Sequence, residues 1–198
     1  HPDVAGVSTI MAAHRKFGTT AMLPTLITDY RDKMEAAIAA VEDAINANVP
    51  GIVGIHLEGP YLNKERKGVH SADIIRPMED DAIDLLSRLP NGRILVTMAP
   101  EKATSGTIKK LSDKGVLVCA GHTAGTYDDI QMAISEGLRG FTHLFNAMSP
   151  LTHREPGVAG AAMADDATWC GLIVDGYHVH PAAVKIAVNA KATGKIML

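Results

Sequence analysis

The sequence predicts an α/β fold with parallel strands, because two kinds of segment alternate along its 198 residues. One kind is a short, continuous apolar run, which is typical of a parallel strand covered on both faces. The other kind has the apolar spacing of an amphipathic helix. Together they have the spacing of repeated β–α units. Seven runs are expected to be strands: residues 20–27, 51–57, 93–99, 116–120, 140–144, 169–174 and 195–198.

Helices are expected between these strands. Apolar residues recur at helical spacing over residues 34–45, with acidic residues between them, and more briefly over residues 83–89. Thr126 and Asp129 have the spacing of a capping box, which predicts a helix that begins just after Thr126. Pro181 suits the first turn of the last helix.

Seven parallel strands suit either a doubly wound sheet or a β/α barrel that lacks one strand. A nucleotide-binding doubly wound sheet usually carries a glycine-rich turn after its first strand. The sequence contains neither GxGxxG nor GxxxxGK[ST], which favours the barrel. No linker, charge block or low-complexity tract interrupts the pattern, so residues 1–198 are expected to form a single domain.

The composition narrows the class of protein. The chain is 46% hydrophobic and 21% charged, as in ordinary globular proteins, and its net charge of −3 gives no reason to expect nucleic acid as a partner. No apolar run approaches the roughly 20 residues of a membrane helix, and no signal peptide is recognisable. Cys119 and Cys170 lie in apolar runs, which predicts buried free thiols and a cytoplasmic location.

Polar residues that can bind a metal ion follow three of the predicted strands. Glu58, His122 and His143 each lie at the carboxyl end of a different strand. The carboxyl ends of parallel strands meet at one edge of the sheet or barrel, where such folds carry their chemistry. One carboxylate and two imidazoles can hold a divalent ion and leave positions open for water. A hydrogen-bonded structural role is the commoner one for any single histidine at a strand end.

Other polar residues lie near the same edge. His56 is two residues before Glu58 in its strand and is expected to have a structural role inside the barrel. Residues 64–70 form a basic loop, which is either a solvated surface loop or a flap that contacts an anion, with His70 reaching inward. Arg154 offers a planar fork for phosphate, although an Arg beside a Glu in a loop is by default a solvated ion pair.

Six motifs, in order along the chain, resemble the N-acetylglucosamine-6-phosphate deacetylase family of the metal-dependent amidohydrolases. They are His56-Leu57-Glu58-Gly59-Pro60, Lys67-Gly68-Val69-His70, Ala120-Gly121-His122-Thr123, Thr142-His143-Leu144-Phe145-Asn146-Ala147-Met148, Arg154-Glu155-Pro156-Gly157 and Asp175-Gly176-Tyr177-His178. The resemblance runs the length of the chain and implies a TIM (β/α)8 barrel that hydrolyses the acetamide of N-acetylglucosamine-6-phosphate to glucosamine-6-phosphate and acetate.

The resemblance implies a role for particular residues. Glu58, His122 and His143 would be ligands of one divalent ion, Zn²⁺ or Fe²⁺, between which the ligand types do not decide. Substrate contacts would fall on Val69, His70, Asn146, Ala147, Arg154, Asp175, Gly176, Tyr177 and His178.

Three of these residues have a more specific implied role. His70 would bind or polarise the acetamide carbonyl, and Arg154 would hold the sugar phosphate. His178 would reach the substrate of a neighbouring subunit, which implies a homodimer.

The resemblance also indicates which family features lie outside these residues. The family has a barrel strand before His1, a small β-sandwich made from both chain ends, and a general-base aspartate at the end of the last barrel strand. The run at residues 195–198 resembles the start of that strand, so the aspartate is expected beyond Leu198. Residues 1–198 alone are therefore expected to form a partial barrel that binds metal and has little or no activity.

Three alternatives stay open at this point. The first is the same reaction on N-acetylgalactosamine-6-phosphate, which differs in the stereochemistry of one hydroxyl. The second is an iron oxygenase with two histidines and one carboxylate as ligands. The third is a barrel fragment that binds a metal ion or a phosphosugar without catalysis.

Overall fold

Seven parallel strands form one sheet in the computed structural model, which describes residues 2–198. Each strand pairs with the next one along the chain, in the order β1 to β7. A doubly wound sheet would reverse its strand order at a switch point, whereas a barrel adds strands in sequence. The predicted barrel-type sheet is therefore confirmed. The strands are β1 (Thr25–Ile27), β2 (Gly54–Glu58), β3 (Arg93–Met98), β4 (Leu117–Ala120), β5 (Gly140–Phe141), β6 (Trp169–Gly171) and β7 (Ile196–Met197).

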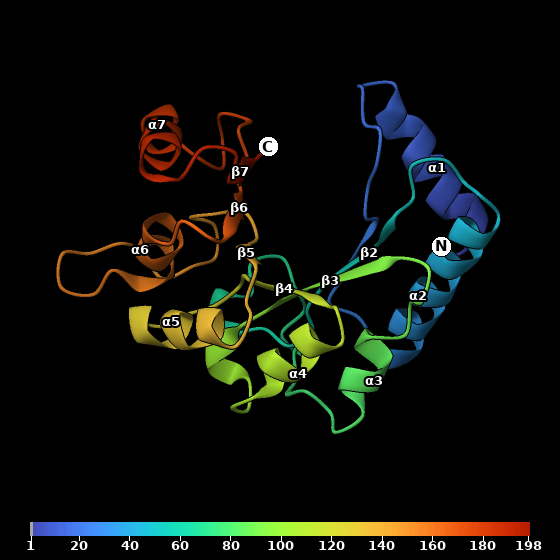
Figure 1. Cartoon of the computed structure of the whole chain (residues 1–198), viewed down its shortest axis with the longest axis horizontal. Coiled ribbons are helices and arrows are strands. Elements are labelled where there is room, and N and C mark those ends of the chain that lie inside the picture. The colour runs from blue at the N-terminus through green and yellow to red at the C-terminus, as the bar shows by residue number, and fades with distance from the viewer. Residues whose placement is uncertain (1) are drawn as a thin grey trace.

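The sheet curls, and helices cover its outer side (Figure 1). The blue N-terminal and red C-terminal elements form two arms, which are joined by the middle strands. Seven α-helices and two short 3₁₀ helices lie within residues 2–198: α1 (Val4–Arg15), α2 (Arg31–Asn46), η1 (Lys64–Arg66), α3 (Ala82–Leu86), η2 (Pro100–Lys102), α4 (Thr107–Asp113), α5 (Tyr127–Ser135), α6 (Gly157–Ala164) and α7 (Pro181–Ala190). None of these helices has the length and apolar character needed to cross a membrane.

Local sequence explains where several elements begin. Thr126 caps α5 with the predicted capping box, in which its hydroxyl accepts from the Asp129 N–H and the Asp129 carboxylate accepts from the Thr126 N–H. Pro181 is the first residue of α7, where its missing N–H costs nothing. The predicted strand at residues 20–27 is shorter than expected and begins at Thr25, because Pro24 has no N–H to donate to a neighbouring strand.

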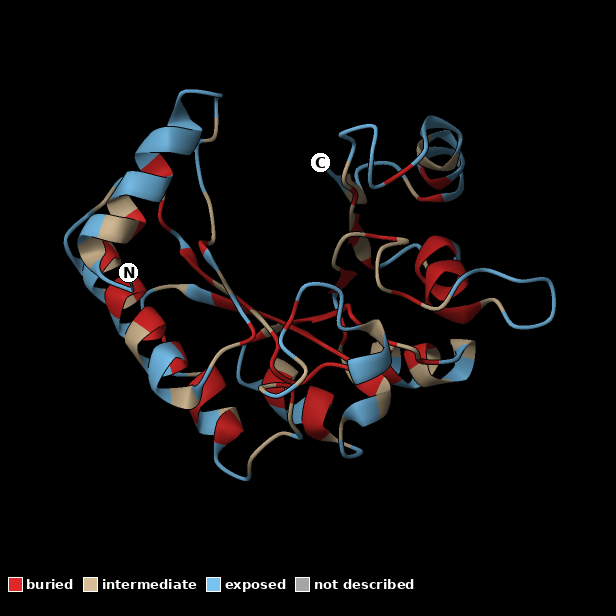
Figure 2. Cartoon of the chain, turned by 180° about the vertical axis from the view of Figure 1, so that it is seen from behind, coloured by how far each residue is buried: buried red, intermediate tan, exposed pale blue. Residues whose placement is uncertain are grey.

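The hydrophobic core lies between the sheet and the helices that cover it. In Figure 2 the helices are red where they face the sheet and pale blue where they face outward. Phe141 in β5 is the largest fully buried side chain of the described residues. Cys119 and Cys170 are buried and unpaired, as the sequence predicts, and burial raises the pKa of both thiols.

A chain of polar side chains crosses the inner side of the sheet. His56 Nδ1 lies 3.0 Å from the Thr25 hydroxyl, and His56 Nε2 lies 2.7 Å from the Thr97 hydroxyl. The Thr97 hydroxyl in turn lies 2.6 Å from that of Thr142. Burial lowers the pKa of His56 to about 4, so its ring is neutral at pH 7. The structural role predicted for His56 is thus to link strands inside the curled sheet.

Candidate metal and substrate site

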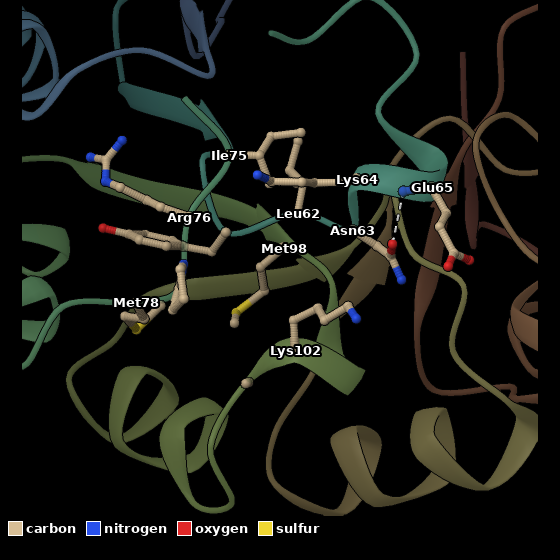
Figure 3. A pocket seen from close by; sticks show the side chains of 12 residues that line it. Leu62, Asn63, Lys64, Glu65, Ile75, Arg76, Met78, Met98 and Lys102 are labelled. Atoms are coloured by element: carbon tan, nitrogen blue, oxygen red, sulfur yellow. Dashed lines mark hydrogen bonds between the residues drawn. The ribbon is translucent and has the colours of Figure 1, made fainter. Parts of the chain in front are cut away.

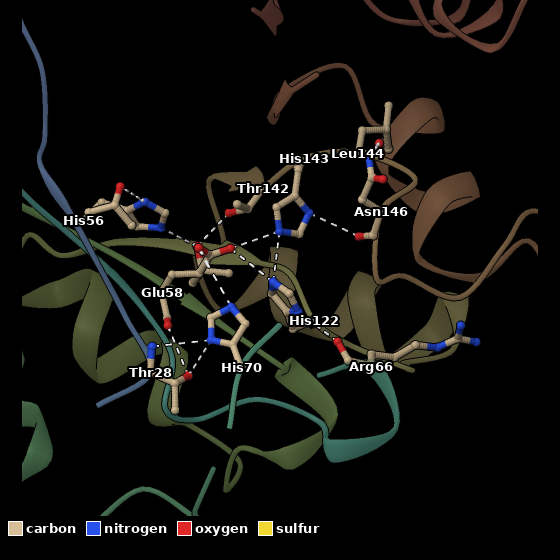
Figure 4. Close-up of polar contacts among 12 residues, drawn as sticks. Thr28, His56, Glu58, Arg66, His70, His122, Thr142, His143, Leu144 and Asn146 are labelled. Atoms are coloured by element: carbon tan, nitrogen blue, oxygen red, sulfur yellow. Dashed lines mark hydrogen bonds and ion pairs between the residues drawn. The ribbon is translucent and has the colours of Figure 1, made fainter. Parts of the chain in front are cut away.

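Glu58, His122 and His143 meet at the carboxyl edge of the sheet (Figure 4). Glu58 Oε1 lies 3.1 Å from His122 Nε2 and 3.0 Å from His143 Nε2, and the two Nε2 atoms are 3.0 Å apart. Glu58 ends β2, while His122 and His143 each follow the end of a strand by two residues. Residues separated by 64 and 21 positions in the chain thus share one small volume because parallel neighbouring strands end together.

Backbone carbonyls fix the orientation of both imidazole rings. His122 Nδ1 lies 2.8 Å from the carbonyl oxygen of Arg66, and His143 Nδ1 lies 3.1 Å from that of Asn146. A carbonyl oxygen can only accept, so each Nδ1 carries the proton. In the neutral rings both Nε2 atoms are then acceptors, and both point at the carboxylate. Histidines that bind metal ions usually donate their other N–H in this way.

Three acceptor atoms at this spacing fit a cation. No hydrogen bond can join two unprotonated Nε2 atoms and a carboxylate oxygen, so without added positive charge their lone pairs repel one another. Without an ion, protons on the two Nε2 atoms would supply that positive charge: burial raises the pKa of Glu58, but hydrogen bonds from His122 and His143 lower it more, so the carboxyl stays ionised. Ligand atoms that each lie about 2.0–2.2 Å from one ion are roughly 2.8–3.6 Å apart, depending on the angle at the ion. The donor set and its spacing therefore fit one divalent ion.

His70 lies beside this cluster, and its imidazole offers a fourth possible ligand atom. Its side chain is buried, its Nε2 lies 4.0 Å from Glu58 Oε2, and its ring centre lies 4.3 Å from that of His122. Glu58, His70 and His122 also form a group that could hold a metal ion. His143 Nε2, however, is 1.0 Å closer to the carboxylate than His70 Nε2 is (4.0 Å against 3.0 Å). The distances favour His143 as the third ligand and leave His70 to face whatever binds next to the ion.

Thr28 holds His70 from the opposite side. The Thr28 hydroxyl lies 2.7 Å from His70 Nδ1, and the Thr28 backbone N–H donates to the same nitrogen at 3.4 Å. The first of these contacts orients the ring so that Nε2 faces Glu58. Burial lowers the pKa of His70, which favours a neutral ring.

The turns that carry these residues have unusual backbone conformations. His122, His143, Phe145 and Ala147 have φ angles of 49°, 40°, 77° and 51°. Such left-handed conformations cost roughly 1–2 kcal/mol each for residues other than glycine. They persist where surrounding contacts hold them, and they are concentrated at functional sites. Here the left-handed turns direct the histidine side chains toward Glu58.

The other residues that the resemblance implies are spread around this edge. Asn146 and Ala147 lie in the turn after β5, next to His143. Val69 is 88% exposed, although its neighbour His70 is buried. Within residues 2–198, no side-chain hydrogen bond joins Arg154 or His178 to the Glu58 cluster. Instead Asp175 accepts from the backbone N–H groups of Tyr177 and His178, and its carboxylate lies 2.6 Å from His178 Nδ1.

Sequence reasoning missed several residues that support the site. Thr28, Asn63 and Glu101 contact His70 or the segment around His122, and none of them belongs to the predicted site. Glu101 could have been found, since it follows β3 at the same edge as Glu58. A separate cavity of about 350 Å³ opens beside η1 and η2 (Figure 3). Neither His70 nor any of Glu58, His122 and His143 lines it.

The fold and the cluster of Glu58, His122 and His143 together define a β/α-barrel protein. Its strands carry, at their carboxyl ends, a set of ligands for a divalent ion. The model of the amidohydrolase family matches residues 4–198, and the chain therefore belongs to the amidohydrolase family.

Relatives and solved structures agree with this family. The chain is 46% identical to N-acetylgalactosamine-6-phosphate deacetylase of Shewanella sp. (strain ANA-3), over 100% of this chain and 50% of that protein. It is 37% identical to N-acetylglucosamine-6-phosphate deacetylase of Bacillus subtilis (strain 168), over 91% and 48%. The crystal structure of N-acetylglucosamine-6-phosphate deacetylase from Pasteurella multocida superposes with a TM-score of 0.93 at 34% identity, over 98% and 51%. The chain spans about half the length of the relatives it matches.

Proposed function

We propose that this chain carries the metal site and most of the substrate contacts of a deacetylase that acts on N-acetylglucosamine-6-phosphate. The observation that carries the proposal is the convergence of Glu58 Oε1, His122 Nε2 and His143 Nε2 within 3.1 Å of one another. Membership of the amidohydrolase family favours hydrolysis over oxygen activation by the same ligand set. The names of the relatives supply the substrate class.

In the proposed reaction, the oxygen of water bonds to the acetamide carbonyl carbon, the C–N bond breaks, and the leaving amine takes a proton. A divalent ion, for which we propose Zn²⁺ or Fe²⁺, contributes Lewis acidity that polarises the carbonyl and makes water more acidic. Glu58, His122 and His143 would hold this ion. The resemblance implies a general-base aspartate at the end of the last barrel strand. The chain spans about half the length of its relatives, and assays therefore use the complete gene product that contains it.

Other residues of the chain would bind and orient the sugar. We propose that Arg154 binds the phosphate, because its guanidinium has no side-chain partner within the described residues and can present its fork to an anion. Val69, Asn146, Ala147, Asp175, Gly176, Tyr177 and His178 are the further proposed contacts. We place His178 at the substrate of a neighbouring subunit, so the proposal includes a homodimer.

The galacto epimer is the second candidate substrate, and the 46% identity to the Shewanella protein favours it. Acetate release from both sugar phosphates, measured side by side on metal-replete protein, tests both candidates. We expect turnover of at least one sugar, loss of turnover after chelation, and recovery when Zn²⁺ or Fe²⁺ is returned. If neither sugar phosphate releases acetate, the proposed function is contradicted.

Replacing His70 by Gln is expected to lower kcat on the order of 10²- to 10³-fold and to leave the bound metal in place. The physical reason is the loss of a ring that we propose polarises the acetamide carbonyl, an effect similar to the loss of one oxyanion donor. Steady-state kinetics and metal analysis of the same preparation check this. His153→Gln, an exposed histidine in a loop, is the matched control. Loss of metal from His70→Gln would instead make His70 a ligand, and an unchanged kcat would exclude the proposed role.

A further inference from the structure

Glu101 is a part-buried carboxylate in η2, just after β3, and it accepts three hydrogen bonds. The donors are the Asn63 side-chain amide at 2.9 Å, the Thr123 hydroxyl at 2.5 Å and the Ala124 backbone N–H at 2.8 Å. A carboxylate that accepts several hydrogen bonds holds its donors strongly, because bonds to charged groups are worth more than neutral ones. Glu101 therefore fixes three points of the chain relative to β3.

All three donors lie next to His122 in the chain or in space. Thr123 and Ala124 follow His122 directly, so Glu101 holds the backbone on its carboxyl side. The Asn63 backbone N–H donates to the His122 carbonyl at 2.9 Å. Asn63 also caps η1, which ends at Arg66, the residue whose carbonyl binds His122 Nδ1. Both the backbone and the ring of His122 are thus tied, through one or two contacts, to the Glu101 carboxylate.

The backbone of His122 needs such support. Its φ of 49° costs about 1–2 kcal/mol for a residue with a Cβ. Return to a negative φ would redirect the Cα–Cβ bond and turn the ring away from Glu58. Thr123 extends the connection further, because its backbone N–H donates to the Ala147 carbonyl at 3.1 Å. The turn that we propose to contact the substrate is therefore connected to the same carboxylate.

We propose that Glu101 is a positioning residue that holds His122 in the orientation needed to bind the metal ion. The inference rests on the proposed metal site formed by Glu58, His122 and His143. Glu101 itself does not touch the cluster and acts through Thr123, Ala124 and Asn63. Outer residues that orient ligands typically contribute 10- to 100-fold to metal affinity.

The test is the dissociation constant of Zn²⁺, measured by competition with a chromophoric chelator on the complete gene product. Glu101→Ala removes all three acceptor contacts and is expected to weaken binding on the order of 100-fold. Glu101→Gln keeps the size of the side chain but loses the acceptor for the Thr123 hydroxyl, and we expect roughly 10-fold weaker binding. Glu136→Gln is the matched control, since Glu136 is also part-buried and accepts a backbone N–H, from Gly106 at 2.9 Å, away from the cluster.

A second readout separates positioning from a general loss of stability. The visible absorption spectrum of the Co²⁺-loaded protein reports ligand geometry, and we expect it to change in Glu101→Gln and to stay unchanged in Glu136→Gln. If Glu101→Ala does not fold, Glu101→Gln alone decides the result. Zn²⁺ affinities and a Co²⁺ spectrum equal to those of the wild type would overturn the inference. Failure of the wild type to bind any divalent ion would overturn the proposed metal site as well.

Discussion

Replacement of Glu58 by Gln is expected to abolish retention of the metal ion and, with it, hydrolysis. Glu58 is the only carboxylate among residues 2–198 with an oxygen within 4.0 Å of a ring nitrogen of His122 or His143. Its amide counterpart has no negative charge to attract a cation, and it presents either a weaker oxygen donor or an NH₂ group to the two Nε2 atoms. We expect metal affinity to fall at least about 100-fold, more than for any change outside the ligand set.

Metal content after desalting and acetate release are the measurements for this variant. Glu65→Gln makes the same chemical change at an exposed position of η1, seven residues along the chain, and should leave both unchanged. Circular dichroism of the metal-free proteins shows whether the fold is kept. One equivalent of metal in purified Glu58→Gln protein would remove Glu58 from the site.

The largest expected loss of stability follows the replacement of Phe141 by Ala. The Phe141 side chain is completely buried, and its removal leaves a cavity next to the strands β4 and β6, with which β5 pairs. Replacements of this kind lower the free energy of unfolding by about 3–5 kcal/mol. Urea denaturation is the measurement. Tyr177→Ala removes an aromatic ring that is 94% exposed and is expected to change the free energy of unfolding by less than about 0.5 kcal/mol. A loss below 1 kcal/mol for Phe141→Ala would contradict the burial on which the prediction depends.

The strands and most helices could be predicted because each has a local signal. Continuous apolar runs identify the seven strands, and the Thr126–Asp129 pair identifies the start of α5. The patterns given for the sequence identify α2, α3, α5 and α7 but not α1, α4 and α6. In α6, the sequence Gly157–Ala164 consists of small and apolar residues that are buried almost throughout, so no polar face marks a period. Its helical state depends on tertiary packing rather than on an amphipathic pattern.

The cluster of Glu58, His122 and His143 could be predicted for a different reason. Glu58, His122 and His143 each follow a strand, and parallel strands bring their carboxyl ends together whatever the distance in sequence. The supporting contacts have no such rule. The histidines contact the backbone carbonyls of Arg66 and Asn146. Which carbonyl lies near each ring depends on the path of the loops. Every residue has a carbonyl, so the residue type does not predict these contacts. Glu101 lies three residues beyond the end of β3, and only the hydrogen bonds that its carboxylate accepts connect it to the site.

The hydrogen-bonded chain from Thr25 through His56 and Thr97 to Thr142 couples the tautomer of His56 to the direction in which the hydroxyl groups donate. A neutral imidazole has one N–H and one acceptor nitrogen, so the Thr97 hydroxyl either donates to His56 Nε2, with the ring proton on Nδ1, or accepts from Nε2–H and is free to donate to Thr142. Loss of the Thr142 hydroxyl removes the acceptor of the second arrangement, which favours donation from Thr97 to His56 Nε2 and a ring proton on Nδ1. The tautomer of a histidine in β2 is thus coupled to a threonine that directly follows β5, and ¹⁵N chemical shifts of its ring would report a substitution three strands away in the sheet.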